Sequence, residues 1–192
     1  NVKMLFALEG TILSKVRTIK TIDEAMLLRN NVLKSAEISK SNIISIASNN
    51  SALDLMYNLK FKEVGIEPLE NKPINLIEQL NQMFTYLVSI EAVIYLMKIY
   101  PGMSFTLNLG TSSGYDVESV DQTVIAETFS ATSPKSNGKL KKDVIRLNAN
   151  DNALHKYSFY YSGVDSPVYV ENLKRAFPNV NIIKISFDDH IK

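Results

Sequence analysis

The chain has 192 residues, of which 45% are apolar, so it can bury one sizeable core or a core with a helical appendage. It has no cysteine and only two histidines, which excludes a disulfide framework and thiolate ligands and argues against a histidine-rich zinc site. Because 21 Lys and Arg balance 20 Asp and Glu, the formal charge is +1, and any surface that binds nucleic acid must be local.

Residues 1–72 are predicted to form a helical N-terminal region. Thr21 followed by Glu24 is typical of a capping box, and Ser51 is suited to capping a second helix. The first residues show no charged segment followed by an apolar run and a cleavage site. This pattern favours a cytoplasmic location.

A long apolar segment follows, and Pro73 is predicted to lie in the first turn of a helix that Pro101 and Gly102 end. Polar residues interrupt this segment too often for a membrane span: Glu78, Gln79, Asn81, Gln82, Glu91 and Lys98. We therefore expect a buried helix and no membrane partner.

The rest of the chain alternates strands and helices. The spacing of apolar residues predicts strands over 104–109, 115–118 and 123–131, a helix over 139–147, a strand over 155–161, a helix over 168–177 and a strand over 180–187. Residues 73–192 are therefore expected to form an α/β domain with a mixed central sheet flanked by helices.

Three acidic residues stand in unusual places in this order. Glu91 lies among apolar residues of the long helix, where a buried carboxylate needs a partner. Asp116 opens the second predicted strand, and Glu127 interrupts the β-branched third one. If these two strands pair as a hairpin, Asp116 and Glu127 converge at one edge. Paired carboxylates bind Mg²⁺ or Mn²⁺ through hard oxygen ligands.

Each of these acids also has a purely structural interpretation. Glu91 can be a salt-bridged helix residue, and Asp116 can close a turn by bonding nearby backbone amides. Glu118 and Asp121 are alternative acids close by, and both are suited to a turn or to the surface.

The order of elements, taken with the three acids, resembles the αβββαβ core of the PD-(D/E)xK nuclease superfamily, which includes many restriction endonucleases. In that family a helix glutamate, an aspartate that starts one strand and a glutamate in the next strand bind the metal. The matching residues here are Glu91, Asp116 and Glu127. The resemblance covers residues 73–187. It implies a Mg²⁺-dependent type II restriction endonuclease that acts on double-stranded DNA and in which Mn²⁺ can replace Mg²⁺. Residues 1–72 lie outside the resemblance, and in such an enzyme we expect them to contact the DNA or to form a homodimer.

One position departs from the family pattern. Two residues after the strand glutamate the family usually has a lysine that orients the attacking water, but this chain has Phe129, whose ring cannot do so. Lys139 and Lys142, which share a face of the following predicted helix, can supply the charge from a neighbouring element. Alternatively, Phe129 indicates a catalytically inactive module that binds DNA or a protein partner.

Basic residues gather in the segment 135–146, which carries five of them and a single acid, Asp143. Lys135, Lys141 and Arg146 are accordingly predicted to contact DNA phosphates, in the way that counterion-releasing patches do. A third interpretation remains open, in which the resemblance is accidental and the chain is an interaction domain without a catalytic site.

Overall fold

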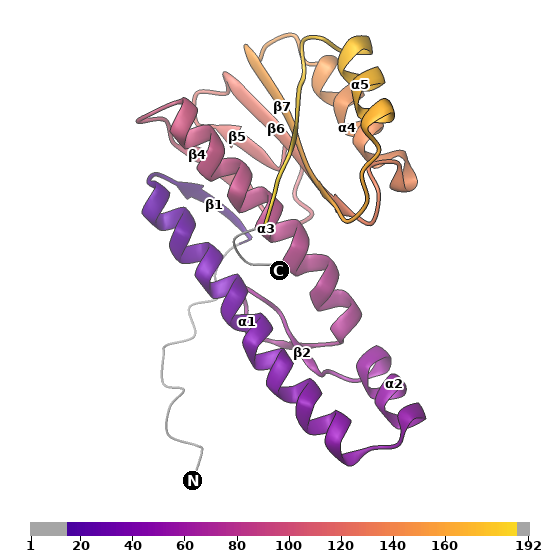
Figure 1. The fold of residues 1–192 in the computed structure, drawn as a ribbon. Coiled ribbons are helices and arrows are strands. Elements are labelled where there is room, and N and C mark those ends of the chain that lie inside the picture. The colour runs from indigo at the N-terminus through magenta and orange to yellow at the C-terminus, as the bar shows by residue number, and fades with distance from the viewer. Residues whose placement is uncertain (1–14, 188–192) are drawn as a thin grey trace.

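Six strands form one mixed sheet in the computed structural model, which describes residues 15–187 of the chain (Figure 1). In spatial order they are β1 (Val16–Ile19), β4 (Phe105–Asn108), β5 (Val117–Ser119), β6 (Val124–Ala131), β7 (His155–Ser162) and β8 (Asn181–Lys184). Neighbouring strands from β1 to β6 run antiparallel, whereas β6, β7 and β8 run parallel to one another. The predicted α/β class with a mixed central sheet is confirmed.

Helices cover both faces of this sheet (Figure 1). The long helix α3 (Leu76–Ile99) crosses one face, and α1 (Ile22–Asn49) packs alongside it. On the other face lie α4 (Lys139–Asn148), which the short 3-10 helix η1 (Ser136–Gly138) precedes, and α5 (Pro167–Ala176). The far ends of α1 and α3 form an arm that projects away from the sheet and carries α2 (Ala52–Phe61).

Both predicted helix caps are present. The side chain of Thr21 accepts a hydrogen bond from the backbone N–H of Glu24 at the start of α1. Ser51 accepts one from the backbone N–H of Asp54 at the start of α2. These bonds satisfy amides that have no partner within the helix, which is why the two helices begin where they do.

Successive side chains of β6 point alternately into two separate hydrophobic cores. Val124 and Ala126 belong to the core under α3, together with Phe159 of β7. Ile125 and Phe129 belong to the core under α4 and α5. Phe129 is only 8% exposed, so the residue that replaces the family's lysine fills a packing position.

The apolar segment that forms α3 is the central helix of the first core. By length and composition alone α3 could cross a membrane, but 56% of its most apolar 18-residue window is buried inside the structure. Ile90 and Leu96 are completely buried in this core. The prediction of a buried core helix is therefore confirmed.

The region before residue 73 contains short strands in addition to the two helices α1 and α2. β1 pairs with β4 and so gives the sheet an edge strand from this region. The two-residue strands β2 (Gly65–Ile66) and β3 (Pro73–Ile74) pair with each other. Strands this short leave too little alternation in the sequence to be recognised.

The start of α3 also differs from the prediction. Pro73 lies in β3, and α3 begins at Leu76 with Asn75 as its N-cap. The Asn75 side chain accepts a hydrogen bond from the backbone N–H of Glu78, so the helix begins after a capping asparagine and does not include the proline. The parts of the predicted regions within residues 1–14 and 188–192, and the predicted lack of a leader segment, lie outside the described residues.

Candidate functional site

Asp116 and Glu127 meet across the antiparallel pair β5 and β6. The register aligns Val117 with Ala126 and Glu118 with Ile125. Continued by one residue, it sets Asp116, which immediately precedes β5, opposite Glu127. Glu127 is 1% exposed, although it is a charged residue in the middle of a strand. The expected convergence of the two acids at one place therefore follows from the hairpin.

The Asp116 carboxylate is fixed to the neighbouring strand. Its Oδ2 accepts hydrogen bonds from the backbone N of Thr128 at 2.7 Å and from Thr128 Oγ1 at 3.0 Å. Thr128 Oγ1 lies 2.6 Å from Ser89 Oγ of α3, so one polar chain links the helix, β6 and the aspartate. An aspartate that merely closes a turn would bond amides of its own loop. Asp116 instead anchors the end of β5 to β6.

Glu127 contacts a cation that comes from α4. Arg146 Nη1 forms an ion pair with Glu127 Oε1, and Arg146 Nη2 donates a hydrogen bond to the carbonyl oxygen of Gly114 at 2.5 Å. The guanidinium also lies over the ring of Tyr115, 4.7 Å from its centroid. Arg146, predicted to contact DNA phosphate, therefore lies against the acid pair.

A third acid, Asp143, completes what we call the acidic cluster: Asp116, Glu127 and Asp143. Asp143 is 3% exposed and forms an ion pair with Lys139 one turn earlier on α4. Its second oxygen, Oδ2, is buried and has no hydrogen-bond partner among the described residues. From the sequence alone, Asp143 stands out only as the single acid of a basic segment. One sequence signal could have revealed the role of Asp143. It is the spacing of Lys139, Asp143 and Arg146, which puts the three side chains along one side of α4.

The acids of the cluster perturb one another. Burial and the nearby Asp116 carboxylate raise the pKa of Glu127 to about 8, against the opposing influence of Arg146. Burial also raises the pKa of Asp143 to about 6, although the ammonium group of Lys139 acts in the opposite direction. Raised carboxyl pKa values in one small region are typical of sites that bind a cation or transfer a proton.

The other basic residues singled out from the sequence have different surroundings. Lys139 reaches Asp143, whereas Lys142 is exposed on α4. Lys141 is also exposed, and the ammonium group of Lys135 lies 5.9 Å from the ring centroid of Tyr169. Of the two lysines proposed to replace the missing one, the structure brings Lys139 to the acidic cluster.

Glu91 has a partner on a different element. Its Oε1 lies 2.5 Å from Nε of Arg29, and this ion pair joins α3 to α1. The α3 residue that does reach the strand hairpin is Ser89, two positions earlier, through Thr128. The structure thus gives Glu91 the salt bridge of its structural interpretation, and its role as a metal ligand stays a prediction.

The alternative acids near the hairpin have ordinary structural roles. Asp121 Oδ1 accepts hydrogen bonds from Ser119 Oγ at 2.6 Å and from Thr123 Oγ1 at 2.8 Å in the turn between β5 and β6. Glu118 lies within β5, aligned with Ile125. Neither residue takes part in the contacts that hold Asp116 and Glu127.

The acidic cluster offers oxygen donors, which suit a hard cation such as Mg²⁺. Within residues 15–187, no group of three or more His, Cys, Asp or Glu side chains is arranged to hold a metal ion. Mg²⁺, however, usually keeps several waters and uses only one or two protein carboxylates together with substrate phosphates. Asp116 and Glu127, two carboxylates opposite each other on neighbouring strands, fit that smaller requirement.

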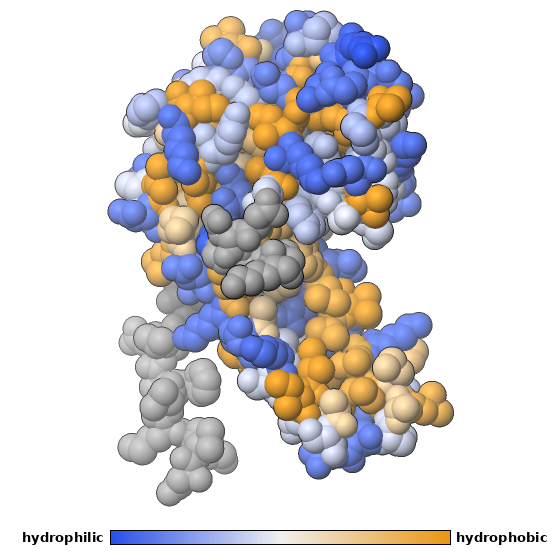
Figure 2. Space-filling view, in the orientation of Figure 1, coloured by the Kyte–Doolittle hydropathy of each residue, from blue (hydrophilic) through white to orange (hydrophobic). Residues whose placement is uncertain are grey.

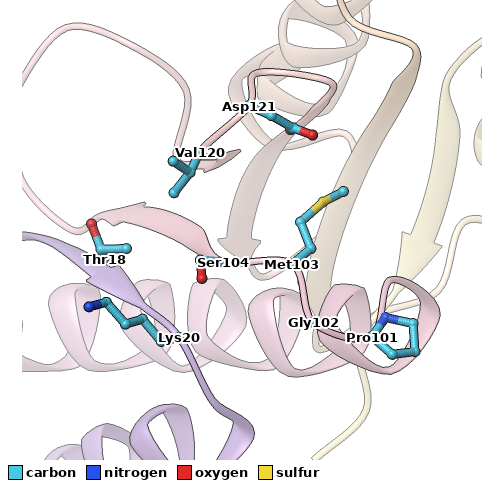
Figure 3. A pocket seen from close by; sticks show the side chains of 8 residues that line it. All are labelled: Thr18, Lys20, Pro101, Gly102, Met103, Ser104, Val120 and Asp121. Atoms are coloured by element: carbon cyan, nitrogen blue, oxygen red, sulfur yellow. The ribbon is translucent and has the colours of Figure 1, made fainter.

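A separate pocket of about 630 Å³ lies at the opposite end of β5 from Asp116 (Figure 3). Residues from β1 and its C-terminal end, from the segment between α3 and β4, and from the turn after β5 surround it: Thr18, Lys20, Pro101, Gly102, Met103, Ser104, Val120 and Asp121. None of the acids of the cluster lines this pocket. This pocket and the acidic cluster therefore lie in different places.

Comparison with protein-family models, with curated proteins and with solved structures gave no match for this chain. A function must therefore be argued from the geometry of the acidic cluster and from the sequence resemblance.

Proposed function

We propose that this chain is a metal-dependent endonuclease of the PD-(D/E)xK type that hydrolyses phosphodiester bonds of double-stranded DNA, as a type II restriction endonuclease does. The observation that carries the proposal is the buried pair of Asp116 and Glu127 on neighbouring antiparallel strands. The order α3, β4, β5, β6, α4, β7, with β7 parallel to β6, supports it because this is the αβββαβ order of that superfamily.

In this proposal Asp116 and Glu127 hold Mg²⁺, or Mn²⁺ in its place, with waters and a DNA phosphate as the remaining ligands. The ion would polarise the phosphate and activate a water. Thr128 keeps Asp116 at the end of β5 through its two hydrogen bonds. Glu91 would assist only indirectly, because Arg29 engages its carboxylate.

The charge that the family's lysine supplies would come from α4. Phe129 cannot supply it, since its ring is packed between the sheet and the helices. Lys139 is the favoured replacement because its positive charge lies close enough to Glu127 to lower the pKa of that carboxyl, whereas Lys142 is exposed. Lys135 and Lys141 remain available as phosphate contacts on the outer side of the same segment.

A second copy of this chain is the proposed protein partner. α2 has no buried residue, and a ten-residue helix of this kind is marginal in water on its own. Its exposed apolar residues follow the spacing of one helical face: Leu53, Met56, Tyr57 and Phe61. Figure 2 shows apolar residues continuing from α2 onto the neighbouring part of α3, where Ile77 and Leu80 are exposed. We call this surface the apolar arm face.

A second copy fits the apolar arm face because a two-fold contact brings the same patch together from both subunits. Such a contact requires no opposite charges: the patch itself is apolar, and the ammonium groups of Lys60 and Lys62 lie beside it, over the rings of Phe61 and Tyr57. A two-fold dimer would also suit a palindromic DNA site. The proposed enzyme would act in the cytoplasm, where its substrate is found.

The alternative function is a catalytically inactive module of the same fold that binds DNA or a protein partner. One observation favours it specifically: Arg146 already engages Glu127, so the acid pair has a cation without any metal. Under this alternative the cluster is a structural element and Phe129 marks the loss of the catalytic lysine.

DNA cleavage separates the two functions. Plasmid and phage DNA would be incubated with Mg²⁺ or Mn²⁺ and with the wild type, Asp116→Asn, Glu127→Gln or the control Glu118→Gln, which changes an acid of the same hairpin outside the cluster. We expect discrete fragments from the wild type and the control, and at least about a hundredfold less cutting by the other two. Absence of cutting by the wild type with either ion, while DNA binding persists, would favour the inactive module.

A further inference from the structure

Arg146 separates Glu127 from solvent. The Glu127 side chain is 1% exposed, whereas the Arg146 side chain that contacts it is 49% exposed. Arg146 is held by three contacts at once: the Glu127 carboxylate, the Gly114 carbonyl oxygen at 2.5 Å and the ring of Tyr115 at 4.7 Å. Two of these partners belong to the loop before Asp116, so the guanidinium bridges both strands that carry the acid pair.

A divalent ion and Arg146 compete for the same group. The guanidinium already contacts Oε1 of Glu127, and a second cation on that carboxylate would repel it at close range with little water to screen the charges. Arg146 must therefore move away from Glu127 before both oxygens of this carboxylate are free to bind a metal ion. Its half-exposed side chain in the last turn of α4 leaves room for that movement.

DNA offers Arg146 a partner to replace Glu127. A guanidinium binds phosphate oxygens through two parallel N–H bonds, as it does a carboxylate. Lys135 and Lys141, exposed on the same segment, provide local positive charge that would bring a phosphate close to Arg146.

We propose that Arg146 is a DNA-operated latch on the acidic cluster. Without DNA it neutralises Glu127 and keeps the affinity for divalent ions low. A phosphate of bound DNA draws the guanidinium away and opens Glu127 to the ion, so metal binding depends on the substrate. This inference deepens the proposed function and rests on it.

Binding of Mn²⁺ to the full chain tests the latch without any catalysis. The rise in Tm with Mn²⁺ concentration at pH 8 gives an apparent Kd for each variant. Without DNA, Arg146→Gln is expected to bind Mn²⁺ about tenfold more tightly than the wild type. Arg175→Gln, which removes an exposed arginine from the last turn of α5, should match the wild type, and adding Glu127→Gln to Arg146→Gln should abolish the gain.

The second arm adds a phosphorothioate duplex that resists cleavage. The Mn²⁺ bound by the complex of Glu127→Gln with the same duplex measures binding that does not involve Glu127, and it is subtracted. After this subtraction, the wild type in complex with the duplex should bind Mn²⁺ as tightly as Arg146→Gln does without DNA. Tyr115→Leu removes the ring beneath the guanidinium, together with the hydroxyl that accepts a hydrogen bond from Asn150, and should tighten Mn²⁺ binding without DNA by about threefold. This variant keeps the test decisive if Arg146→Gln does not fold.

The failures of the latch and of the proposed function are distinguishable. If the wild type without DNA binds Mn²⁺ through Glu127 as tightly as Arg146→Gln or Tyr115→Leu does, the latch is wrong and the metal site stands. If no variant binds Mn²⁺ through Glu127, alone or with the duplex, the metal-dependent function is wrong and the latch with it.

Discussion

The ionisation of Asp143 opposes folding. Its pKa is raised from 3.8 to about 6 by burial, so the folded chain holds this proton more tightly than the unfolded chain does. As pH rises between these two pKa values, the proton leaves the unfolded chain but stays on the folded one. The stability that protonated Asp143 contributes therefore falls as pH rises. Above pH 6 the folded protein contains a buried carboxylate with one unpartnered oxygen.

We therefore predict that Asp143→Asn stabilises the protein at pH 8 and has little effect near pH 4. At about 1.4 kcal/mol per pKa unit, the gain at pH 8 is on the order of 1 to 3 kcal/mol. The amide oxygen of the new side chain can still accept a hydrogen bond from Lys139. Urea unfolding at both pH values measures the difference, with Asp151→Asn as the exposed control. A gain in the free energy of unfolding that is the same at pH 4 and pH 8 would contradict the raised pKa of Asp143.

The acid pair could be predicted from the sequence, but its partners could not. Glu127 stands out because it is the one charged residue of its strand, and the hairpin brings Asp116 opposite it. Arg146 and Lys142 look alike in the sequence, since both are basic residues of one amphipathic helix. Which of them faces the sheet depends on how α4 packs against β6, and that is decided by tertiary contacts with the second core.

At the scale of elements, α3 is held in place by two different polar links. Ser89 connects it to β6, and Glu91 connects it to α1 through Arg29. The sequence placed Glu91 correctly in a buried helix, but it could not identify a partner sixty-two residues away. Non-local ion pairs of this kind carry no local pattern, whereas the strands and helices themselves follow from hydrophobic periodicity.

The Arg29–Glu91 ion pair gives a prediction that separates the two roles of Glu91. Both side chains are largely buried, at 11% and 22% exposure, so Glu91→Ala leaves Arg29 without its partner. We expect a loss of about 2 kcal/mol in the free energy of unfolding. Because Arg29 already engages this carboxylate, the affinity for Mn²⁺ should stay at the wild-type value.

Glu37→Ala is the matched control for this loss. Glu37 pairs with Lys40 on the exposed face of α1, where the side chains are 74% and 65% exposed, and its removal should cost under about 0.5 kcal/mol. Chemical unfolding of the two variants measures the free energy of unfolding, and Mn²⁺ titration measures the affinity for the ion. Weaker Mn²⁺ binding by Glu91→Ala at unchanged stability would instead support the family's metal-ligand role.

At the scale of the whole molecule, the sheet with its helices and the arm differ in how they are stabilised. The sheet has a hydrophobic core on each face, whereas α2 contributes no buried residue to either. The sequence predicted the helices of the arm from their caps and apolar spacing. It could not show that the apolar face of α2 points to solvent, because a face that packs inside one chain and a face that packs against another have the same periodicity.

The exposed apolar arm face leads to a prediction about oligomeric state. If two copies pair through it, the chain should be a dimer at micromolar concentration, and Met56→Glu should make it a monomer because a buried, unpaired carboxylate costs several kcal/mol. Val168→Glu is the matched control, since Val168 of α5 is 74% exposed and lies outside the arm. Light scattering coupled to size-exclusion chromatography gives the mass of each variant. A wild type that is monomeric at tens of micromolar, or a Met56→Glu variant that remains a dimer, would exclude the arm face as the contact between subunits.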